Sequence, residues 1–101
     1  MIRDLADLAE AAGGRLNGDN REFGLVSTDS RSLPSGALFV ALRGERFDGH
    51  EFLPEAARAG AAGALVERVS EPVLAAGLAQ VVVVDALAGL SRLAKAWRRC
   101  F

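Results

Sequence analysis

The middle of the chain reads ALFVALRGERFDGHEFLPEAARAGAAGALV from Ala37 to Val66. Its first six residues are all apolar, and such a run favours a strand that is buried on both faces of a sheet. A helix is predicted next, because Asp48 is a good N-cap, Gly60 is a good stop signal and the apolar residues between them recur at helical spacing. Residues 64–66 are predicted to form a second apolar strand. A strand, a helix and a strand in this order predict a βαβ unit with parallel strands.

The flanking sequence extends this unit on both sides. A helix is expected over residues 2–12, where apolar residues recur at helical spacing up to a Gly-Gly pair. Turn dipeptides in residues 15–24 predict a small hairpin, and a short strand is expected over residues 25–29. Four valines at residues 81–84 predict another buried strand, and Asp85 is expected to cap the last helix. We therefore predict an α/β domain with a small, mostly parallel sheet and flanking helices.

Length and charge limit the class of protein. The chain has 101 residues, a length suited to a single domain over residues 1–101. Its formal net charge is −1, so it offers no broad positive field for a nucleic acid or an anionic membrane. The longest apolar stretch, residues 73–84, is interrupted and too short to span a bilayer, and the first residues lack the apolar run of a signal peptide. We expect a soluble cytoplasmic protein that is a monomer.

Composition also excludes several kinds of site. Cys100 is the only cysteine and His50 the only histidine, which rules out an internal disulfide and a Cys/His zinc site. We therefore predict no metal in this chain. Neither a G-x-x-x-x-G-K-[ST] phosphate loop nor a G-x-G-x-x-G dinucleotide motif occurs. A complete ATPase or dinucleotide-dependent enzyme is excluded, and we assign no catalytic residue.

Two polar segments follow predicted strands, at the edge of a parallel sheet where ligands bind. Residues 27–31 offer three hydroxyls, a carboxylate and a guanidinium, and residues 44–50 lead into the central helix. The N-terminus of that helix, together with Arg31 or Arg46, suits a phosphate or a diphosphate. Phe47 suits stacking on a flat base. These residues predict a small anion-binding or nucleotide-binding module.

The same residues also have a purely structural interpretation. Asp29 and Arg31 can form a local ion pair of little energetic weight, and His50 can cap a helix rather than catalyse a reaction. Phe47 can fill the core, and the helical spacing of Trp97 from the leucines before it predicts a core position. A noncatalytic module that contacts partner proteins is therefore the alternative to a nucleotide site.

Three strings in this sequence carry a resemblance to a known family. They are STDSR (27–31), GALFVALRG (36–44) and ERFDGH (45–50). In order and spacing they resemble the N-terminal domain of the Mur ligases of bacterial cell-wall synthesis, and the resemblance covers essentially the whole chain. Within that family, the Arg-Phe before Asp-Gly-His most resembles the ligases that add D-alanyl-D-alanine to UDP-N-acetylmuramoyl-tripeptide. The ligases that add the third amino acid are the nearest alternative.

The resemblance implies a division of labour. This domain would bind the UDP end of UDP-N-acetylmuramoyl-tripeptide, while ATP and Mg²⁺ would bind to a central domain absent from this chain. The parent enzyme would activate the peptide carboxylate as an acyl phosphate, which the amine of D-alanyl-D-alanine attacks. The chain is therefore expected to be a fragment without ligase activity of its own. By their positions in the family's motifs, the UDP-binding residues are expected to be Thr28, Ser30, Arg31, Glu45, Arg46, Phe47, Asp48, Gly49 and His50.

Overall fold

The centre of the domain is a five-stranded sheet in the computed structural model, which describes residues 2–44 and 48–100, with side chains as far as residue 95. The strands are β1 (Arg15–Asn17), β2 (Val26–Ser27), β3 (Leu38–Val40), β4 (Gly63–Val66) and β5 (Gln80–Val82). They lie in the order β1-β5-β4-β3-β2. The four strands from β2 to β5 are parallel, and β1 pairs with β5 in the antiparallel direction. The predicted mostly parallel sheet is confirmed.

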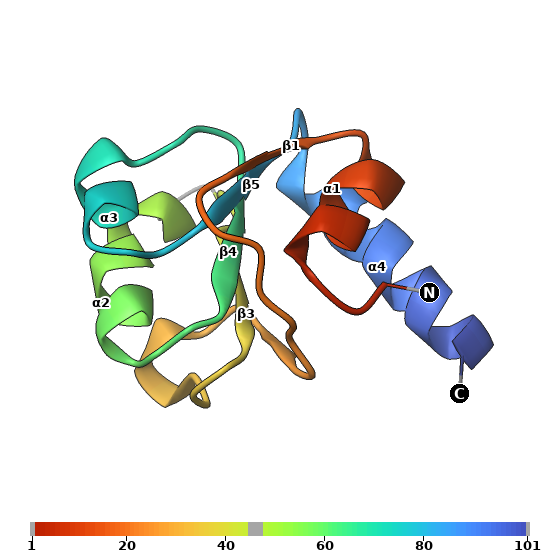
Figure 1. The fold of residues 1–101 in the computed structure, drawn as a ribbon, viewed down its shortest axis with the longest axis horizontal. Coiled ribbons are helices and arrows are strands. Elements are labelled where there is room, and N and C mark those ends of the chain that lie inside the picture. The colour runs from red at the N-terminus through yellow and green to blue at the C-terminus, as the bar shows by residue number, and fades with distance from the viewer. Residues whose placement is uncertain (1, 45–47, 101) are drawn as a thin grey trace.

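Helices cover both faces of this sheet, as Figure 1 shows. One face carries α1 (Leu5–Ala12) and α4 (Ala86–Cys100), and the other carries α2 (Leu53–Arg58) and α3 (Glu71–Ala75). The arrangement has three layers, helix on sheet on helix, and it confirms the α/β class. No helix within the described residues is long and apolar enough to cross a membrane.

Two hydrophobic cores result, one on each face of the sheet. In β3, Leu38 and Val40 belong to the core shared with α1 and α4, whereas Phe39 between them belongs to the core shared with α2 and α3. Strand β4 alternates in the same way around Leu65. Successive residues of a strand face opposite sides, so a strand covered on both faces must be apolar throughout. Every residue of β3 and β4 is buried, as predicted.

Local signals set the start of the central helix. Asp48 accepts a hydrogen bond of 3.0 Å from the backbone N–H of His50 and caps a 3₁₀ turn over Gly49–Phe52. This turn leads directly into α2, whose first turn contains Pro54. A proline is tolerated there because the first N–H groups of a helix have no partner within the helix. The βαβ unit and the Asp48 cap are therefore confirmed.

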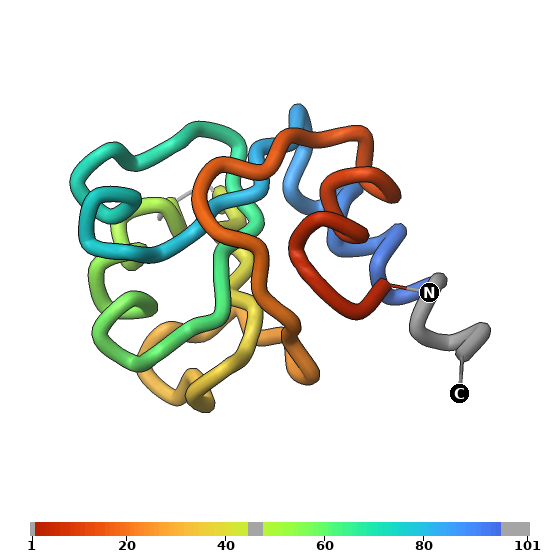
Figure 2. Tube along the Cα trace, viewed as in Figure 1, coloured from red at the N-terminus to blue at the C-terminus, as the bar shows by residue number. Residues whose placement is uncertain are grey.

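The hairpin predicted over residues 15–24 is wrong. Residues 15–17 form β1, but its partner is β5, with Leu16 opposite Val81. Figure 2 shows how the chain runs from α1 along β5 and then turns away toward β2. The connection pairs with the residues just before α1: Glu22 forms an isolated antiparallel bridge with Asp4, and the backbone N–H of Phe23 donates to the carbonyl of Arg3. The Phe23 side chain is buried. Pairing with β5 wins because it satisfies the free edge of that strand, which a local hairpin would leave open.

Smaller differences concern the ends of elements. The first helix begins at Leu5 rather than residue 2, because Asp4 accepts from the backbone N–H of Asp7 and caps it. The strands predicted at residues 25–29 and 81–84 are β2 and β5, both shorter or shifted. Val84 is 97% exposed, so it lies outside the sheet. Helix α3 was not predicted at all.

The predicted cap of the last helix is confirmed. The Oδ1 atom of Asp85 accepts from the backbone N–H groups of Leu87 and Ala88, in the first turn of α4. Two other predictions fall outside what the structure describes. These are the core position of the Trp97 side chain and both interpretations of Phe47.

Candidate functional site

A cleft with a volume of about 520 Å³ opens beyond the carboxyl ends of β2 and β3. We call it the β2–β3 cleft. The two polar segments that the sequence singled out meet there, although they are far apart along the chain. Its lining residues are Thr28, Asp29, Ser30, Arg31, Leu42, Gly49 and Phe52. The structure thus brings together four of the predicted site residues, Thr28, Ser30, Arg31 and Gly49.

The first wall of the cleft is a 3₁₀ turn over Ser30–Ser32 that Asp29 caps. The carboxylate of Asp29 accepts from the backbone N–H of Arg31 at 2.9 Å, and this bond holds the pKa of Asp29 below its usual value. The predicted ion pair is also present, with 3.4 Å between Asp29 Oδ1 and Arg31 Nε. The Arg31 side chain is 85% exposed, so this pair adds little stability and the guanidinium can turn toward a ligand.

Two hydroxyls on this wall differ in what they already bind. The Oγ of Ser30 donates to Oε2 of Glu55, on α2, at 3.0 Å. Within residues 2–44 and 48–100, the Thr28 hydroxyl makes no hydrogen bond, and its side chain is exposed. A hydroxyl has one hydrogen to donate and two lone pairs that accept. Thr28 is therefore able to donate to a ligand, whereas Ser30 is left mainly as an acceptor.

The second wall is formed by Leu42, Gly49 and Phe52. The backbone N–H of Gly49 donates to the carbonyl of Leu42 at 2.7 Å. The two backbones are so close that a Cβ on Gly49 would lie 2.8 Å from both the nitrogen and the oxygen of Leu42. Leu42 and the partly exposed Phe52 make this wall apolar and partly aromatic. Neither of these two residues was predicted from the sequence.

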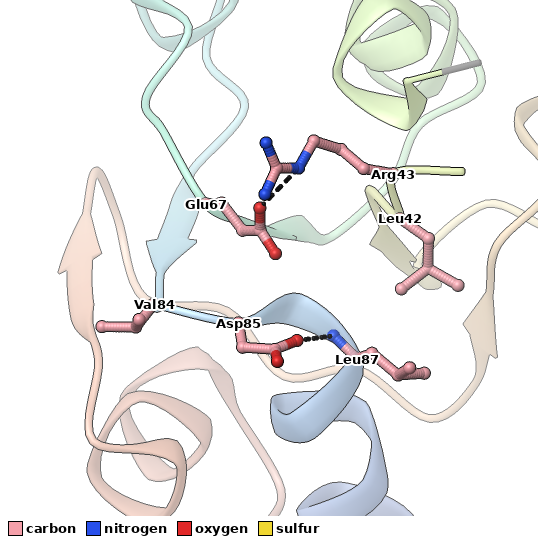
Figure 3. A pocket seen from close by; sticks show the side chains of 6 residues that line it. All are labelled: Leu42, Arg43, Glu67, Val84, Asp85 and Leu87. Atoms are coloured by element: carbon pink, nitrogen blue, oxygen red, sulfur yellow. Dashed lines mark hydrogen bonds and ion pairs between the residues drawn. The ribbon is translucent and has the colours of Figure 1, made fainter. Parts of the chain in front are cut away.

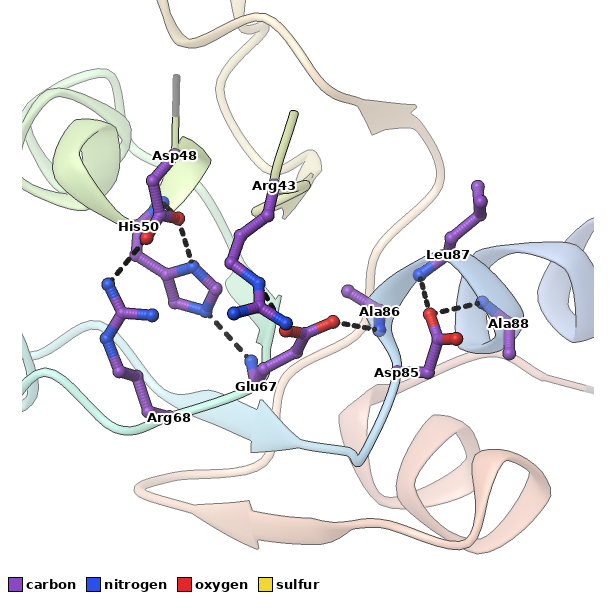
Figure 4. Close-up of polar contacts among 9 residues, drawn as sticks. All are labelled: Arg43, Asp48, His50, Glu67, Arg68, Asp85, Ala86, Leu87 and Ala88. Carbon is purple, nitrogen blue, oxygen red and sulfur yellow. Dashed lines mark hydrogen bonds and ion pairs between the residues drawn. The ribbon is translucent and has the colours of Figure 1, made fainter. Parts of the chain in front are cut away.

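Asp48 and His50 are also predicted site residues, but neither lines this cleft. Figure 4 shows their contacts with Glu67 and Arg68 instead. The Asp48 carboxylate accepts from Arg68 at 2.7 Å and from His50 through both the backbone N–H and the ring Nδ1. The Arg68 hydrogen bond is the main cause that holds the pKa of Asp48 far below its usual range, although burial opposes it. The His50 side chain is only 4% exposed. It borders a separate pocket of about 250 Å³, which Arg68 also lines.

A further cleft, of about 380 Å³, lies beyond β3, β4 and β5 (Figure 3). It is lined by Leu42, Arg43, Glu67, Val84, Asp85 and Leu87. The Nε of Arg43 lies 2.9 Å from Oε1 of Glu67, and Oε2 of Glu67 accepts from the backbone N–H of Ala86 at 2.9 Å. Glu67 and Arg68 are not among the site residues predicted from the sequence. Both directly follow β4, so the rule that ligands bind beyond the carboxyl ends of strands would have found them.

The remaining predicted site residues, Glu45, Arg46 and Phe47, lie outside the described residues. Across the described part of the chain, no group of three or more His, Cys, Asp or Glu side chains is placed to hold a metal ion. The chemistry on offer is therefore hydroxyl and guanidinium hydrogen bonding beside an apolar wall, which suits binding of a polar, partly flat, anionic molecule.

Comparison with known families decides the family. The model described as "Mur ligase family, catalytic domain" matches residues 22–98. The chain belongs to the Mur ligase family. The resemblance carried by the three sequence strings is thus confirmed, and all three strings fall within the matched range.

Individual Mur ligases are similar over most of this chain. UDP-N-acetylmuramoyl-tripeptide–D-alanyl-D-alanine ligase of Synechocystis is 47% identical over 76 residues (75% of this chain, 16% of the relative). The Escherichia coli enzyme of that name is 45% identical over 95 residues (94% and 20%). UDP-N-acetylmuramoyl-L-alanyl-D-glutamate–2,6-diaminopimelate ligase of Chlorobium phaeobacteroides is 38% identical over 95 residues (94% and 18%). The chain spans about a fifth of the length of the curated relatives that it matches.

A solved structure agrees with these relatives. Crystal structure I of MurF from Acinetobacter baumannii has a TM-score of 0.74 and 37% sequence identity. The match covers 85% of this chain and 19% of that one. The two proteins therefore share a fold over this matched part of the chain.

Replacing Asp48 with asparagine is expected to destabilise this Mur ligase domain by about 1–2 kcal/mol at neutral pH, because the pair with Arg68 is lost and the cap is weakened. The pKa of Asp48 is lower in the folded than in the unfolded state, so its stabilisation is present above the unfolded pKa of 3.8 and is lost as pH falls. The difference in the free energy of unfolding between wild type and Asp48→Asn should therefore become smaller as the pH falls from about 5 to about 2.

Urea unfolding followed by circular dichroism at several pH values measures this difference. Asp19→Asn is the matched control, because Asp19 is exposed and is expected to change stability by no more than about 0.5 kcal/mol at neutral pH. If the free energies of unfolding of Asp48→Asn and wild type differ by the same amount down to acid pH, Asp48 is not a paired carboxylate in the folded state.

Proposed function

We propose that this chain is the N-terminal, UDP-substrate-binding domain of an ATP-dependent ligase that adds D-alanyl-D-alanine to UDP-N-acetylmuramoyl-tripeptide. The observation that carries the proposal is the β2–β3 cleft, where two distant segments line one cavity at the ligand-binding edge of the sheet. Two of the relatives described above, at 47% and 45% identity, are named for this reaction. Their greater length leaves room for the domains that would perform the chemistry.

The walls of the cleft suit the two parts of a uridine diphosphate. The exposed Arg31 guanidinium can bind the diphosphate through charge-assisted hydrogen bonds. The Thr28 hydroxyl can donate to a uracil carbonyl or a phosphate oxygen, and Ser30 can accept. Leu42 and Phe52 can cover a face of the base. The proposed contacts of Glu45, Arg46 and Phe47 rest on their positions in the family's motifs.

ATP and Mg²⁺ do not fit the residues present, and we place both outside this chain. The sequence has no phosphate-binding loop of the G-x-x-x-x-G-K-[ST] type, and the described residues contain no carboxylate or histidine group that could hold a metal. In the proposed ligase this domain contributes substrate binding and no catalytic residue. We further propose that the ligase works in the cytoplasm, because a single cysteine suits a reducing compartment. We also propose that it is a monomer.

Titration of UDP, and then of UDP-N-acetylmuramoyl-tripeptide, into the chain tests the proposed site. Amide NMR shifts that saturate are expected at Thr28, Arg31 and Gly49. Replacing Arg31 with glutamine is expected to weaken binding about fivefold, because one exposed charged contact is worth about 1 kcal/mol. Binding of UDP alone should be weaker than binding of the tripeptide conjugate, which offers further groups for contact.

Arg15→Gln is the matched control for this titration. Arg15 is also an exposed arginine, but it lies on β1, at the opposite edge of the sheet from β2. The control should bind as the wild type does. A folded chain without saturable shifts, or with shifts centred on β1, would reject the nucleotide site and favour a module that contacts partner proteins.

A second candidate function is favoured by the match to the Chlorobium phaeobacteroides ligase, which is named for 2,6-diaminopimelate. The two candidates share the UDP end of the substrate, so the titration above cannot separate them. Product formation by the complete polypeptide separates them. We expect ligation of D-alanyl-D-alanine to UDP-N-acetylmuramoyl-tripeptide, whereas ligation of 2,6-diaminopimelate to the shorter UDP-N-acetylmuramoyl-L-alanyl-D-glutamate would reverse the assignment.

A further inference from the structure

The side chain of His50 uses both ring nitrogens within the chain (Figure 4). Nδ1 lies 2.6 Å from Oδ1 of Asp48, and Nε2 accepts from the backbone N–H of Glu67 at 2.9 Å. A backbone N–H can only donate, so Nε2 must be the nitrogen without a hydrogen, and Nδ1 carries the hydrogen that Asp48 accepts. With both nitrogens occupied and the ring buried, His50 has no ring nitrogen left to form a hydrogen bond with a ligand or to transfer a proton to it.

These bonds join two segments that are far apart along the chain. Asp48 and His50 precede α2, while Glu67 and Arg68 follow β4. Two bonds cross between the segments, from the Glu67 N–H to His50 and from the Arg68 guanidinium to Asp48 at 2.7 Å. We call these four residues the His50 clamp. It fixes the start of the 3₁₀ turn against the end of β4.

The clamp lies directly behind the second wall of the β2–β3 cleft. Gly49 stands between the two clamp residues Asp48 and His50, and its N–H holds the carbonyl of Leu42 at 2.7 Å. Both Gly49 and Leu42 line the cleft. The carboxylate of Glu67 also pairs, at 2.9 Å, with Arg43, the residue that follows Leu42 in the chain. Arg43 and Asp48 face each other in an isolated antiparallel bridge. Asp48 and His50 on one side of the wall, and Arg43 on the other, therefore connect it to Glu67 and Arg68, the residues that follow β4.

We propose that His50 is a positioning residue, which holds Gly49 and Leu42 in place as a wall of the UDP cleft and does not itself touch the substrate. The inference rests on the proposed function, because the cleft must bind the UDP substrate for its wall to matter. It differs from the sequence expectation, in which His50 was a direct UDP contact.

Two substitutions of His50 separate its two hydrogen bonds. In His50→Gln, the terminal amide oxygen reaches the position of Nε2 and can still accept from Glu67. In His50→Asn, the amide nitrogen takes the position of Nδ1 and can donate to Asp48, but the shorter side chain does not reach Glu67. We expect His50→Asn to weaken binding of UDP-N-acetylmuramoyl-tripeptide about tenfold or more, as for a buried N–H left without an acceptor. His50→Gln should stay within about threefold of wild type.

Three readouts distinguish a positioning role from other roles. The ring ¹⁵N shifts of the wild type should show hydrogen on Nδ1 and not on Nε2, with or without UDP. In the complete ligase, His50→Asn should raise KM for the UDP substrate with kcat unchanged. A direct contact would instead make both variants lose affinity equally, and a catalytic role would lower kcat. A stability role alone would lower the unfolding midpoint without changing KM. Any of these three results would overturn the proposal.

A variant at Arg68 keeps the test decisive where His50→Asn does not fold. The Arg68 side chain is 58% exposed, so Arg68→Gln should fold. The substitution removes the ion pair between the Arg68 guanidinium and the Asp48 carboxylate, which is the second bond of the clamp. We expect it to weaken substrate binding about twofold to fivefold, and unchanged binding would count against the clamp. Failure of the wild type to bind UDP would reject the proposed function. Binding by wild type and equally by every clamp variant would reject only the clamp.

Discussion

Replacing Phe39 with alanine is expected to destabilise the domain by about 3–5 kcal/mol. Phe39 is 1% exposed and lies in the middle of β3, the first strand of the βαβ unit, in the core shared with α2 and α3. Its neighbours in that core include several alanines, which are too small to fill the space that the ring leaves. A domain of this size has a total stability of about 5–15 kcal/mol, so this one substitution removes a large part of it.

Urea unfolding followed by far-ultraviolet circular dichroism measures the loss. Phe39→Leu should be intermediate in stability between wild type and Phe39→Ala, with a loss of about 1–1.5 kcal/mol in the free energy of unfolding, because most of the apolar volume is kept. Leu25→Ala is the surface control, since Leu25 is 56% exposed and its truncation should change stability by no more than about 0.5 kcal/mol. A loss of less than about 1 kcal/mol for Phe39→Ala would contradict a separate core on this face of the sheet.

The central βαβ unit could be predicted because its signals are local and agree with one another. The six apolar residues from Ala37, the cap at Asp48 and the stop at Gly60 each have a physical meaning that does not depend on the rest of the chain. The structure places β3, α2 and β4 in that order and makes both strands buried. Parallel strands that helices cover on both faces are apolar at every residue, and such an unbroken apolar run can be recognised in the sequence.

The N-terminal strand could not be placed for the opposite reason. Residues 15–17 pair with β5, which is far away along the chain, and no local sequence pattern predicts that pairing. The turn at Asn17-Gly18 is present as a bend, with Gly18 at φ +102°, but the chain does not return as a second strand. The valine run at 81–84 was likewise misleading at its end, since Val83 still donates to Val66 whereas Val84 has left the sheet.

About half of the candidate site could be predicted from the sequence. Thr28, Ser30, Arg31 and Gly49 could be predicted because the segments that follow buried strands gather at one sheet edge. Leu42 and Phe52 were missed because an apolar residue at the end of an apolar run carries no sign that it faces a cleft. The contacts of His50 could not be predicted, because its Nε2 accepts from the backbone N–H of Glu67, seventeen residues away, and no side-chain pattern reveals that bond.

Replacing Gly49 with alanine is expected to damage both the stability of the domain and the proposed UDP site. The added Cβ would lie 2.8 Å from the backbone nitrogen and oxygen of Leu42 and 2.9 Å from the Cα of Ala41. These atoms belong to the backbone that continues β3, so they cannot move aside as the end of a flexible side chain would. The 2.7 Å hydrogen bond from Gly49 to Leu42 must therefore break. We expect a loss of about 2–4 kcal/mol in stability, from overpacking and the lost bond together.

The same displacement should open the second wall of the β2–β3 cleft, because Gly49 and Leu42 both line it. Binding of UDP-N-acetylmuramoyl-tripeptide, measured at a temperature where the variant is folded, should weaken about tenfold or more. Gly24→Ala is the matched control, since a Cβ at Gly24 meets no atom within 4 Å and its φ is not positive. That variant should match wild type in both measurements. If Gly49→Ala loses stability but binds the substrate as tightly as Gly24→Ala does, the wall formed by Gly49 and Leu42 is not part of the UDP site, and binding must instead depend on the Thr28–Arg31 side of the cleft.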